Sequence, residues 1–261
     1  QSPQKPPWQA VLDYEIAQRG RKEADIWARL DTAYAVMKDA VQTGLSEDMT
    51  SFSGMIRNGA KKVATCQVSV LGPEFQQLLA YTLAAKEVNS CMGRVVAAPT
   101  AGASGIMPGV LTTLEKLHHL DKRKLLEGML IAAGIALIIE KRASIAGAVG
   151  GCQAETGTAA AMGAGAIVHC LGGELAQIFE AVAITLMNML GLICDPVAGL
   201  VELPCVKRNG SAAVIAFASA QMALAGDSAV IPVDEVVDAM GEVGAAMESR
   251  YKETAEGGIA N

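Results

Sequence analysis

The chain has 261 residues, half of them apolar but only 4% aromatic, and it carries a formal net charge of −6. This length is ample for a buried core, and small side chains such as Ala and Gly let helices pack closely. Basic residues are scattered, with no run or aromatic interleaving that could follow a phosphate backbone, so nucleic acid is excluded as a partner.

Hydropathy and cysteine content bound the cellular setting. The most apolar stretch, 128–139, is flanked by charged residues and is too short to cross a bilayer, so we expect no membrane span. The opening QSPQKPP has no charged start followed by an apolar core, so we expect no signal peptide. Six cysteines in a chain that needs no disulfides suit a reducing cytoplasm.

Most of the chain shows helical periodicity. Charged and apolar residues alternate at helical spacing from Trp8 to about Gln42, with Gly20 as a break. Further helices are predicted at 74–92, 110–118, 122–140, 158–171, 174–192, 210–225 and 233–251. Irregular segments rich in Gly, Pro, Ser or Asn are predicted at 43–72, 98–109, 144–157 and 194–205.

Strand-like alternation is rare, so the sequence predicts an all-α fold. We expect one catalytic domain, residues 1–261, with central apolar helices rich in Ala and Gly. Amphipathic helices pack around them, and the loops between helices carry the site.

Three of the cysteines have neighbours that shape irregular backbone. Cys152 follows two glycines, Cys194 precedes Asp-Pro, and Cys205 follows a proline. Their spacing contains no CxxC pair, which excludes zinc-ribbon and ferredoxin patterns. Three thiolates suit a cubane cluster with one iron left open as a Lewis acid for a substrate oxygen. The other interpretation is three small core residues, as we expect for Cys66, Cys91 and Cys170.

The loop that begins at Pro99 is the second candidate site. Peptide N–H groups in a Gly-rich turn, beside Ser and Thr hydroxyls, form a concave site for a small anion. The segment lacks the ending of a phosphate-binding P-loop, which disfavours nucleotides. A tight connector between packed helices is the alternative. The candidate binding residues are Thr100, Ala101, Gly102, Ser104 and Gly105.

A third candidate is the basic pair Lys207 and Arg208, directly after Cys205. These side chains could bind a substrate carboxylate or offset the charge of a cluster. The alternative is solvated surface, which is the usual environment of a basic pair.

Together these segments resemble the α subunit, or catalytic domain, of iron–sulfur-dependent L-serine dehydratase. The resemblance is carried by MGRVVAAPTAGASGIMPGVL, ASIAGAVGGCQAETGTAAAMGA, LMNMLGLICDPVAGLVELPCVKRN and SRYKETAEGGIA. Weaker likeness in DYEIAQ and SGMIRNGA extends it over nearly the whole chain.

The resemblance implies a [4Fe–4S] cluster held by Cys152, Cys194 and Cys205, and a reaction without pyridoxal phosphate. L-serine would lose its Cα proton to a base and its hydroxyl to the open iron, giving pyruvate and ammonia, a step of amino-acid catabolism that feeds gluconeogenesis. Candidates for the proton-transferring groups are Glu155, Ser144 and Lys252. The resemblance also implies an oligomer containing a β subunit, or a fused α/β module.

Two other functions remain open from the sequence. The first is a related cluster-dependent lyase that acts on L-threonine or L-cysteine, which the cysteine motifs do not separate from a serine enzyme. The second is a non-catalytic helical protein whose cysteines lie in the core or bind structural zinc.

Overall fold

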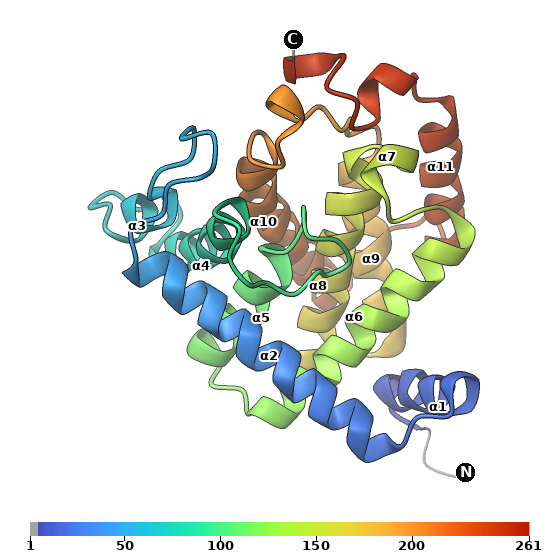
Figure 1. Ribbon diagram of the computed structural model, residues 1–261. Helices are drawn as coiled ribbons and strands as arrows, with labels where there is room; N and C mark the ends of the chain where they lie inside the picture. Colours follow the sequence, from blue (N-terminus) through green and yellow to red (C-terminus); the bar gives the residue numbers. More distant parts are fainter. Residues whose placement is uncertain (1–4, 261) are drawn as a thin grey trace.

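The structure is a computed structural model that describes residues 5–260, and within this range it contains eleven α-helices and no β-strand (Figure 1). The predicted all-α fold is therefore confirmed. Residues 1–4, which open the segment predicted to lack a signal peptide, lie outside the described residues, as does residue 261. None of the described helices is both long and apolar enough to cross a membrane.

The core is organised around α8 (Thr158–Cys170), in which every residue is buried. Its sequence TAAAMGAGAIVHC is mostly Ala and Gly, so the backbones of neighbouring helices can approach closely. The helices packed around it are α5 (Ile106–Leu117), α6 (Lys122–Arg142), α9 (Leu175–Met189) and α10 (Cys205–Leu224). A Cβ on Gly128 of α6 would lie 2.7 Å from the Cys170 sulfur, which shows how tight this packing is.

Amphipathic helices cover this core, as the sequence predicts. In Figure 1, α1 (Pro7–Arg19) lies against α6, and α2 (Glu23–Ser46) crosses α4 (Pro73–Ser90) and α5. Gly20 ends α1 with a left-handed φ of 61°, so the predicted break is confirmed. The remaining helices are α3 (Gly59–Ala64), α7 (Gly147–Gly150) and α11 (Val233–Ala246).

Several helix boundaries differ from the sequence prediction. Helix α5 starts within the predicted loop, because Pro108 falls in the first helical turn, where its missing N–H costs nothing. Segment 43–72 contains the short α3. A π-helical turn, Gln153–Gly157, leads directly into α8, and α10 begins at Cys205 rather than near residue 210. Two of the three candidate ligand cysteines therefore lie at helix starts and not in loops.

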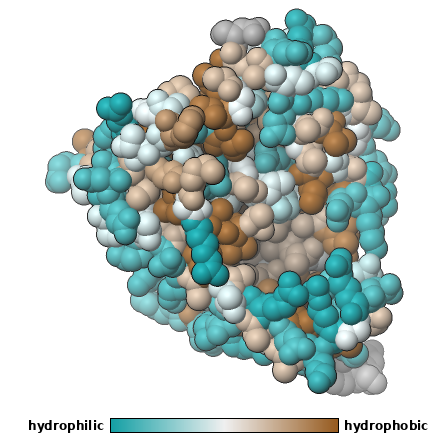
Figure 2. All heavy atoms as spheres, viewed as in Figure 1, coloured by the Kyte–Doolittle hydropathy of each residue, from teal (hydrophilic) through white to brown (hydrophobic). Residues whose placement is uncertain are grey.

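One end of the helical bundle collects the segments that the sequence marks as candidate sites. In Figure 1 this is the upper end, where α7, the start of α10 and the C-terminal tail meet, and the N-terminus lies at the lower end. We use "C-terminal tail" for residues 247–260. On the face of the molecule that is seen in Figure 1, polar residues dominate the rim and apolar residues gather toward the middle (Figure 2).

Candidate active site

Three different elements supply the three candidate ligand cysteines. Cys152 lies between α7 and the π-helical turn, Cys194 lies in the extended segment after α9, and Cys205 is the first residue of α10. All three side chains are buried, and none forms a disulfide. The Cys152 sulfur is 2.9 Å from the hydroxyl of Thr156, one turn further along the chain.

The electrostatics of these thiols show that they share one environment. Burial raises the pKa of Cys194, and the nearby Cys152, Glu155, Glu253 and Cys205 raise it further. Burial likewise raises the pKa of Cys205 to about 12, with Lys86 and Arg208 acting in the opposite direction. The pKa of Cys152 is also raised, mainly by burial. The fold thus brings the three sulfurs together with both carboxyl and cationic groups.

The C-terminal tail closes over Cys194. The Cys194 amide donates to the carbonyl of Tyr251 at 2.8 Å, and the amide of Glu253 donates to the Cys194 carbonyl at 2.8 Å. Asp195 is buried and accepts hydrogen bonds from the Arg208 guanidinium at 2.7 Å and from the Ile259 amide at 2.9 Å. The sequence analysis did not identify Glu253, whose pKa is raised by burial and by Glu155.

The loop 99–105 runs beside this cysteine site, and several of its backbone groups form hydrogen bonds within the loop. The amide of Ala103 donates to the Thr100 hydroxyl at 3.3 Å, and the amide of Ser104 donates to the Ala101 carbonyl at 3.2 Å. Ser104 is fully buried, and its hydroxyl has no partner among the described residues. The amides of Thr100, Ala101 and Gly102 have no acceptor among residues 5–260. The unused donors of the loop are thus three successive amides.

Glu155 connects this loop with the cysteines. The Thr100 hydroxyl donates to Glu155 Oε1, and a Cβ on Gly102 would overlap the same carboxylate. A Cβ on Gly147 would lie 3.3 Å from Glu155 Oε2 and 3.1 Å from the Cys194 sulfur. Glycine at both positions therefore lets the backbone approach a carboxylate that the sequence marks as a catalytic candidate.

A buried lysine that the sequence analysis did not identify lies beneath the same loop. Lys86 on α4 is fully buried, and its ammonium donates to the Val201 carbonyl at 3.0 Å and to Asn89 Oδ1. Burial lowers its pKa from 10.5 to about 8, although Cys205, Glu155 and Glu202 act in the opposite direction. The sequence gives no clear signal for this burial, because Lys86 follows the apolar run of α4 and stands directly before Glu87, as a solvated charged pair would.

A cavity of about 630 Å³ lies beside the loop, and its lining includes neither Lys86, Glu155 nor any of the three cysteines. Ala101 and Gly102 form one wall, and Asn89, Val201 and Glu202 form another. The lining of the cavity also includes the exposed side chains of Phe52 and Met92. Its lining thus contains the two residues that accept hydrogen bonds from Lys86, and two of the three residues with free amides.

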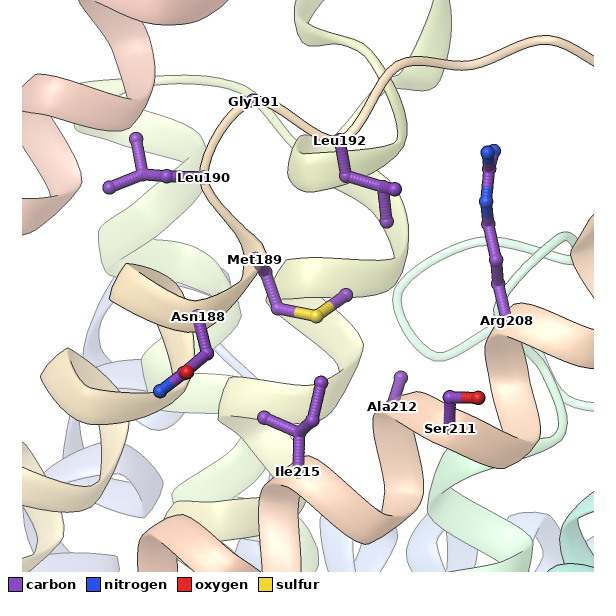
Figure 3. Close-up of a pocket in the computed structure, with 9 residues that line it drawn as sticks. All are labelled: Asn188, Met189, Leu190, Gly191, Leu192, Arg208, Ser211, Ala212 and Ile215. Carbon is purple, nitrogen blue, oxygen red and sulfur yellow. The ribbon is translucent and has the colours of Figure 1, made fainter.

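The remaining predicted site residues are distributed differently. Arg208 leaves α10 and extends away from the apolar floor formed by Met189 and Ile215 in a second cavity, of about 390 Å³ (Figure 3). Its guanidinium also donates to the Ile193 carbonyl at 2.9 Å. Lys207 is exposed and lies beside Glu87, near α3.

Two of the predicted catalytic residues line a third cavity. Ser144 and Lys252 lie there with Gly150 and residues of α11, in a space of about 360 Å³. The structure does not bring them to the cavity that contains the Ala101 and Gly102 amides. Of the three predicted catalytic residues, only Glu155 directly contacts the loop.

The donor set distinguishes between kinds of metal group. Among residues 5–260, no three His, Cys, Asp or Glu side chains converge closely enough to bind a single metal ion. A structural zinc site needs such convergence, because one ion takes all four ligands. In a four-iron cluster each thiolate binds a different iron, so the thiols must surround the cluster and need not converge on one point. Three free thiols on three elements, with Arg208 and Lys86 nearby to offset negative charge, fit a cluster.

The fold and site therefore define an all-α protein with one buried thiol site near a cavity that is lined in part by the glycine-rich loop. The sequence model described as "Serine dehydratase alpha chain" matches residues 4–260. The chain is 44% identical to the L-serine dehydratase alpha chain of Peptoniphilus asaccharolyticus, covering 96% of this chain and 87% of that one. The probable L-serine dehydratase alpha chain of Bacillus subtilis is 42% identical, with 96% and 85% covered.

A longer relative matches as well. The L-serine dehydratase of Streptomyces coelicolor is 39% identical, and the match covers 96% of this chain but only 56% of that protein. Together these matches show that the chain belongs to the serine dehydratase alpha chain family. The resemblance found in the sequence motifs is confirmed.

Proposed function

We propose that this protein dehydrates and deaminates L-serine to pyruvate and ammonia, using a [4Fe–4S] cluster held by Cys152, Cys194 and Cys205 and no pyridoxal phosphate. The observation that carries the proposal is the gathering of three buried thiols, none in a disulfide, near a loop whose Ala101 and Gly102 line a cavity and have amides without an acceptor among residues 5–260. The names of the relatives, L-serine dehydratase, support the substrate.

When bound, such a cluster supplies an open iron that acts as a Lewis acid on the hydroxyl leaving group. The chain's own residues orient the substrate. Its carboxylate is held by the Ala101 and Gly102 amides. The Lys86 ammonium lies behind the cavity residues Asn89 and Val201, whose oxygens it contacts, and adds positive charge without touching the substrate. Thr100 holds Glu155 Oε1 through a hydrogen bond, which leaves Oε2 as the proton acceptor for Cα.

The other predicted residues have supporting roles in this proposal. Ser104 and Gly105 are buried and do not line the cavity, so they shape the loop from its inner side. Arg208 fixes the Cys194 segment through Asp195 and offsets the negative charge of the thiolates. Lys207 balances Glu87, and Ser144 and Lys252 support the Cys152 and Cys194 segments from the opposite cavity.

A β subunit or an equivalent module belongs to the proposal, as does a cytoplasmic location. The alpha chains of similar length and the longer single-chain L-serine dehydratase support a second module, because this chain spans little more than half of the longer enzyme. We propose that the partner covers the exposed mouth of the cavity, where water must be excluded during elimination.

Anaerobic cluster assembly followed by pyruvate measurement tests the proposed function. We compare wild type with Cys194→Ala, and with Cys170→Ala as the matched control, because Cys170 is equally buried but lies at the opposite end of α8. L-serine, L-threonine and L-cysteine are supplied side by side. We expect a brown protein that forms pyruvate from L-serine, with both properties lost only in Cys194→Ala.

The other outcomes are equally informative. A wild-type protein that stays colourless contradicts the cluster, and colour that persists in Cys194→Ala contradicts the ligand set. A brown protein that turns over only threonine or cysteine reassigns the substrate. A brown protein inactive toward all three amino acids, and still inactive after addition of a relative's second module, contradicts the proposed reaction.

A further inference from the structure

The loop 99–105 and the start of α10 meet at a single buried side chain, Asn209. It has no exposed surface and lies four residues after Cys205 on the first turns of α10. The sequence gives little sign of this, because Asn209 follows two basic residues that are typical of a solvated surface.

Both polar atoms of the Asn209 side chain have hydrogen-bond partners on the loop or on the first turn of α10. Its Oδ1 accepts from the Gly105 amide at 3.0 Å. Its Nδ2 donates to the Gly102 carbonyl at 2.9 Å and to the Cys205 carbonyl at 2.8 Å. The side-chain amide of Asn209 thus hydrogen-bonds to both ends of the glycine-rich turn and to the backbone of Cys205, a candidate cluster ligand.

This connection has no substitute among the described residues. The loop's other hydrogen bonds are internal, run to Glu155 or continue into α5, and none of them reaches the Cys205 turn. A buried polar group that loses its partner costs the full desolvation free energy, so the three bonds strongly favour one relative placement of loop and helix.

We propose that Asn209 is the positioning residue that holds the carboxylate-binding loop in register with the Cys205 turn. The position of the loop decides how far the Ala101 and Gly102 amides lie from the groups bound at the cysteine site. Displacement of about 1 Å in a reacting geometry can slow a reaction by roughly a hundredfold. The identity of the ligand in this proposal, an amino acid carboxylate, rests on the proposed function.

Two substitutions at Asn209 separate positioning from folding. Asn209→Asp has almost the same shape and keeps the acceptor for Gly105, but it places a carboxylate oxygen against the Gly102 and Cys205 carbonyls. Asn209→Ser leaves room for a water molecule in place of the amide. The matched control is Asn188→Asp, because Asn188 also donates to a helix carbonyl four residues earlier, that of Ile184, at 2.8 Å.

Three readouts are measured on protein normalised for cluster content by visible absorbance: kcat/KM for L-serine, the affinity for L-alanine, and hydrogen exchange of the metal-free protein. L-alanine carries the carboxylate and amine but has no leaving group. For Asn209→Asp we expect unchanged colour per mole, a kcat/KM lowered by roughly tenfold or more, and weaker L-alanine binding. The Gly105 amide should exchange faster in Asn209→Ser, and Asn188→Asp should match wild type.

The opposite results overturn the proposal. An Asn209→Asp protein with normal colour, and with both kcat/KM and L-alanine affinity within twofold of wild type, excludes a positioning role. If neither Asn209 variant folds, as judged by circular dichroism and a cooperative melt, Asn209 belongs to the folding core instead. If wild type makes no pyruvate, the proposed function fails, while exchange at Gly105 still decides whether Asn209 holds the loop.

Discussion

Replacement of Lys86 by methionine tests whether burial of the Lys86 ammonium lowers the free energy of unfolding. Burial lowers the pKa of Lys86 from 10.5 to about 8. Because the folded state binds this proton more weakly than the unfolded state, the cost is present in full below pH 8 and fades as pH rises toward 10.5. The difference between the two pKa values corresponds to about 3 kcal/mol at neutral pH.

The metal-free Lys86→Met protein should therefore be more stable than wild type at pH 7. Methionine has a similar length and loses two hydrogen bonds, those to Val201 and Asn89, at about 1 kcal/mol each, which leaves a net gain of about 1 kcal/mol. Between pH 7 and pH 9 wild type should recover about 1 kcal/mol relative to the variant, because its Lys86 loses the proton.

Urea unfolding at pH 7 and pH 9 measures both differences, with Lys207→Met as the control that removes an exposed ammonium. If the proposed function is correct, Lys86→Met also raises the KM for L-serine, whereas Lys207→Met does not. A variant less stable than wild type at pH 7, or an advantage that grows between pH 7 and pH 9, would refute the reasoning.

Two further substitutions test the close contacts of the site. Gly102→Ala forces a Cβ into the Glu155 carboxylate, so we expect a loss of about 1–3 kcal/mol in urea unfolding and about tenfold slower pyruvate formation. The control is Gly210→Ala, because the nearest atom to a Cβ there would lie 3.4 Å away, and we expect its stability and activity to stay near those of wild type. Equal effects of the two substitutions would contradict the close contact between Gly102 and Glu155. Asp195→Ala leaves the Arg208 guanidinium without its carboxylate, and we expect about 2–3 kcal/mol lower stability and faster trypsin cleavage in the C-terminal tail. An unchanged cleavage rate would show that Asp195 does not hold the tail.

The helices were predictable where the amphipathic pattern is strong. They were less predictable where glycine and proline occur, because both residues are found in loops and at helix starts. Trp8 to Gln42 has clear amphipathic spacing, and the structure places α1 and α2 there. The segment around Cys152 looked irregular because glycine favours loops, yet it forms α7, which is half buried, and a π-helical turn whose residues are all buried. Burial supplied the packing that local propensity lacks.

The site was predictable to the extent that motifs carry it. The three cysteines and the loop from Thr100 stand out by composition, and the structure brings them to one end of the bundle. Lys86 and Asn209 could not be assigned from sequence alone, because a charged or amide residue within a helix is usually solvated. Only tertiary packing shows that both side chains are fully buried against the loop.

The pairing of the C-terminal tail with Cys194 affects the order in which the site can form during synthesis. Cys152, Cys194 and Cys205 leave the ribosome well before Tyr251, Glu253 and Ile259, the residues that hold the Cys194 segment from the other side. A nascent chain can therefore build the helical core around α8 while the thiol site is still open. The site closes only when the tail emerges, so folding of the helical core and closure of the thiol site are separate events in the life of the chain.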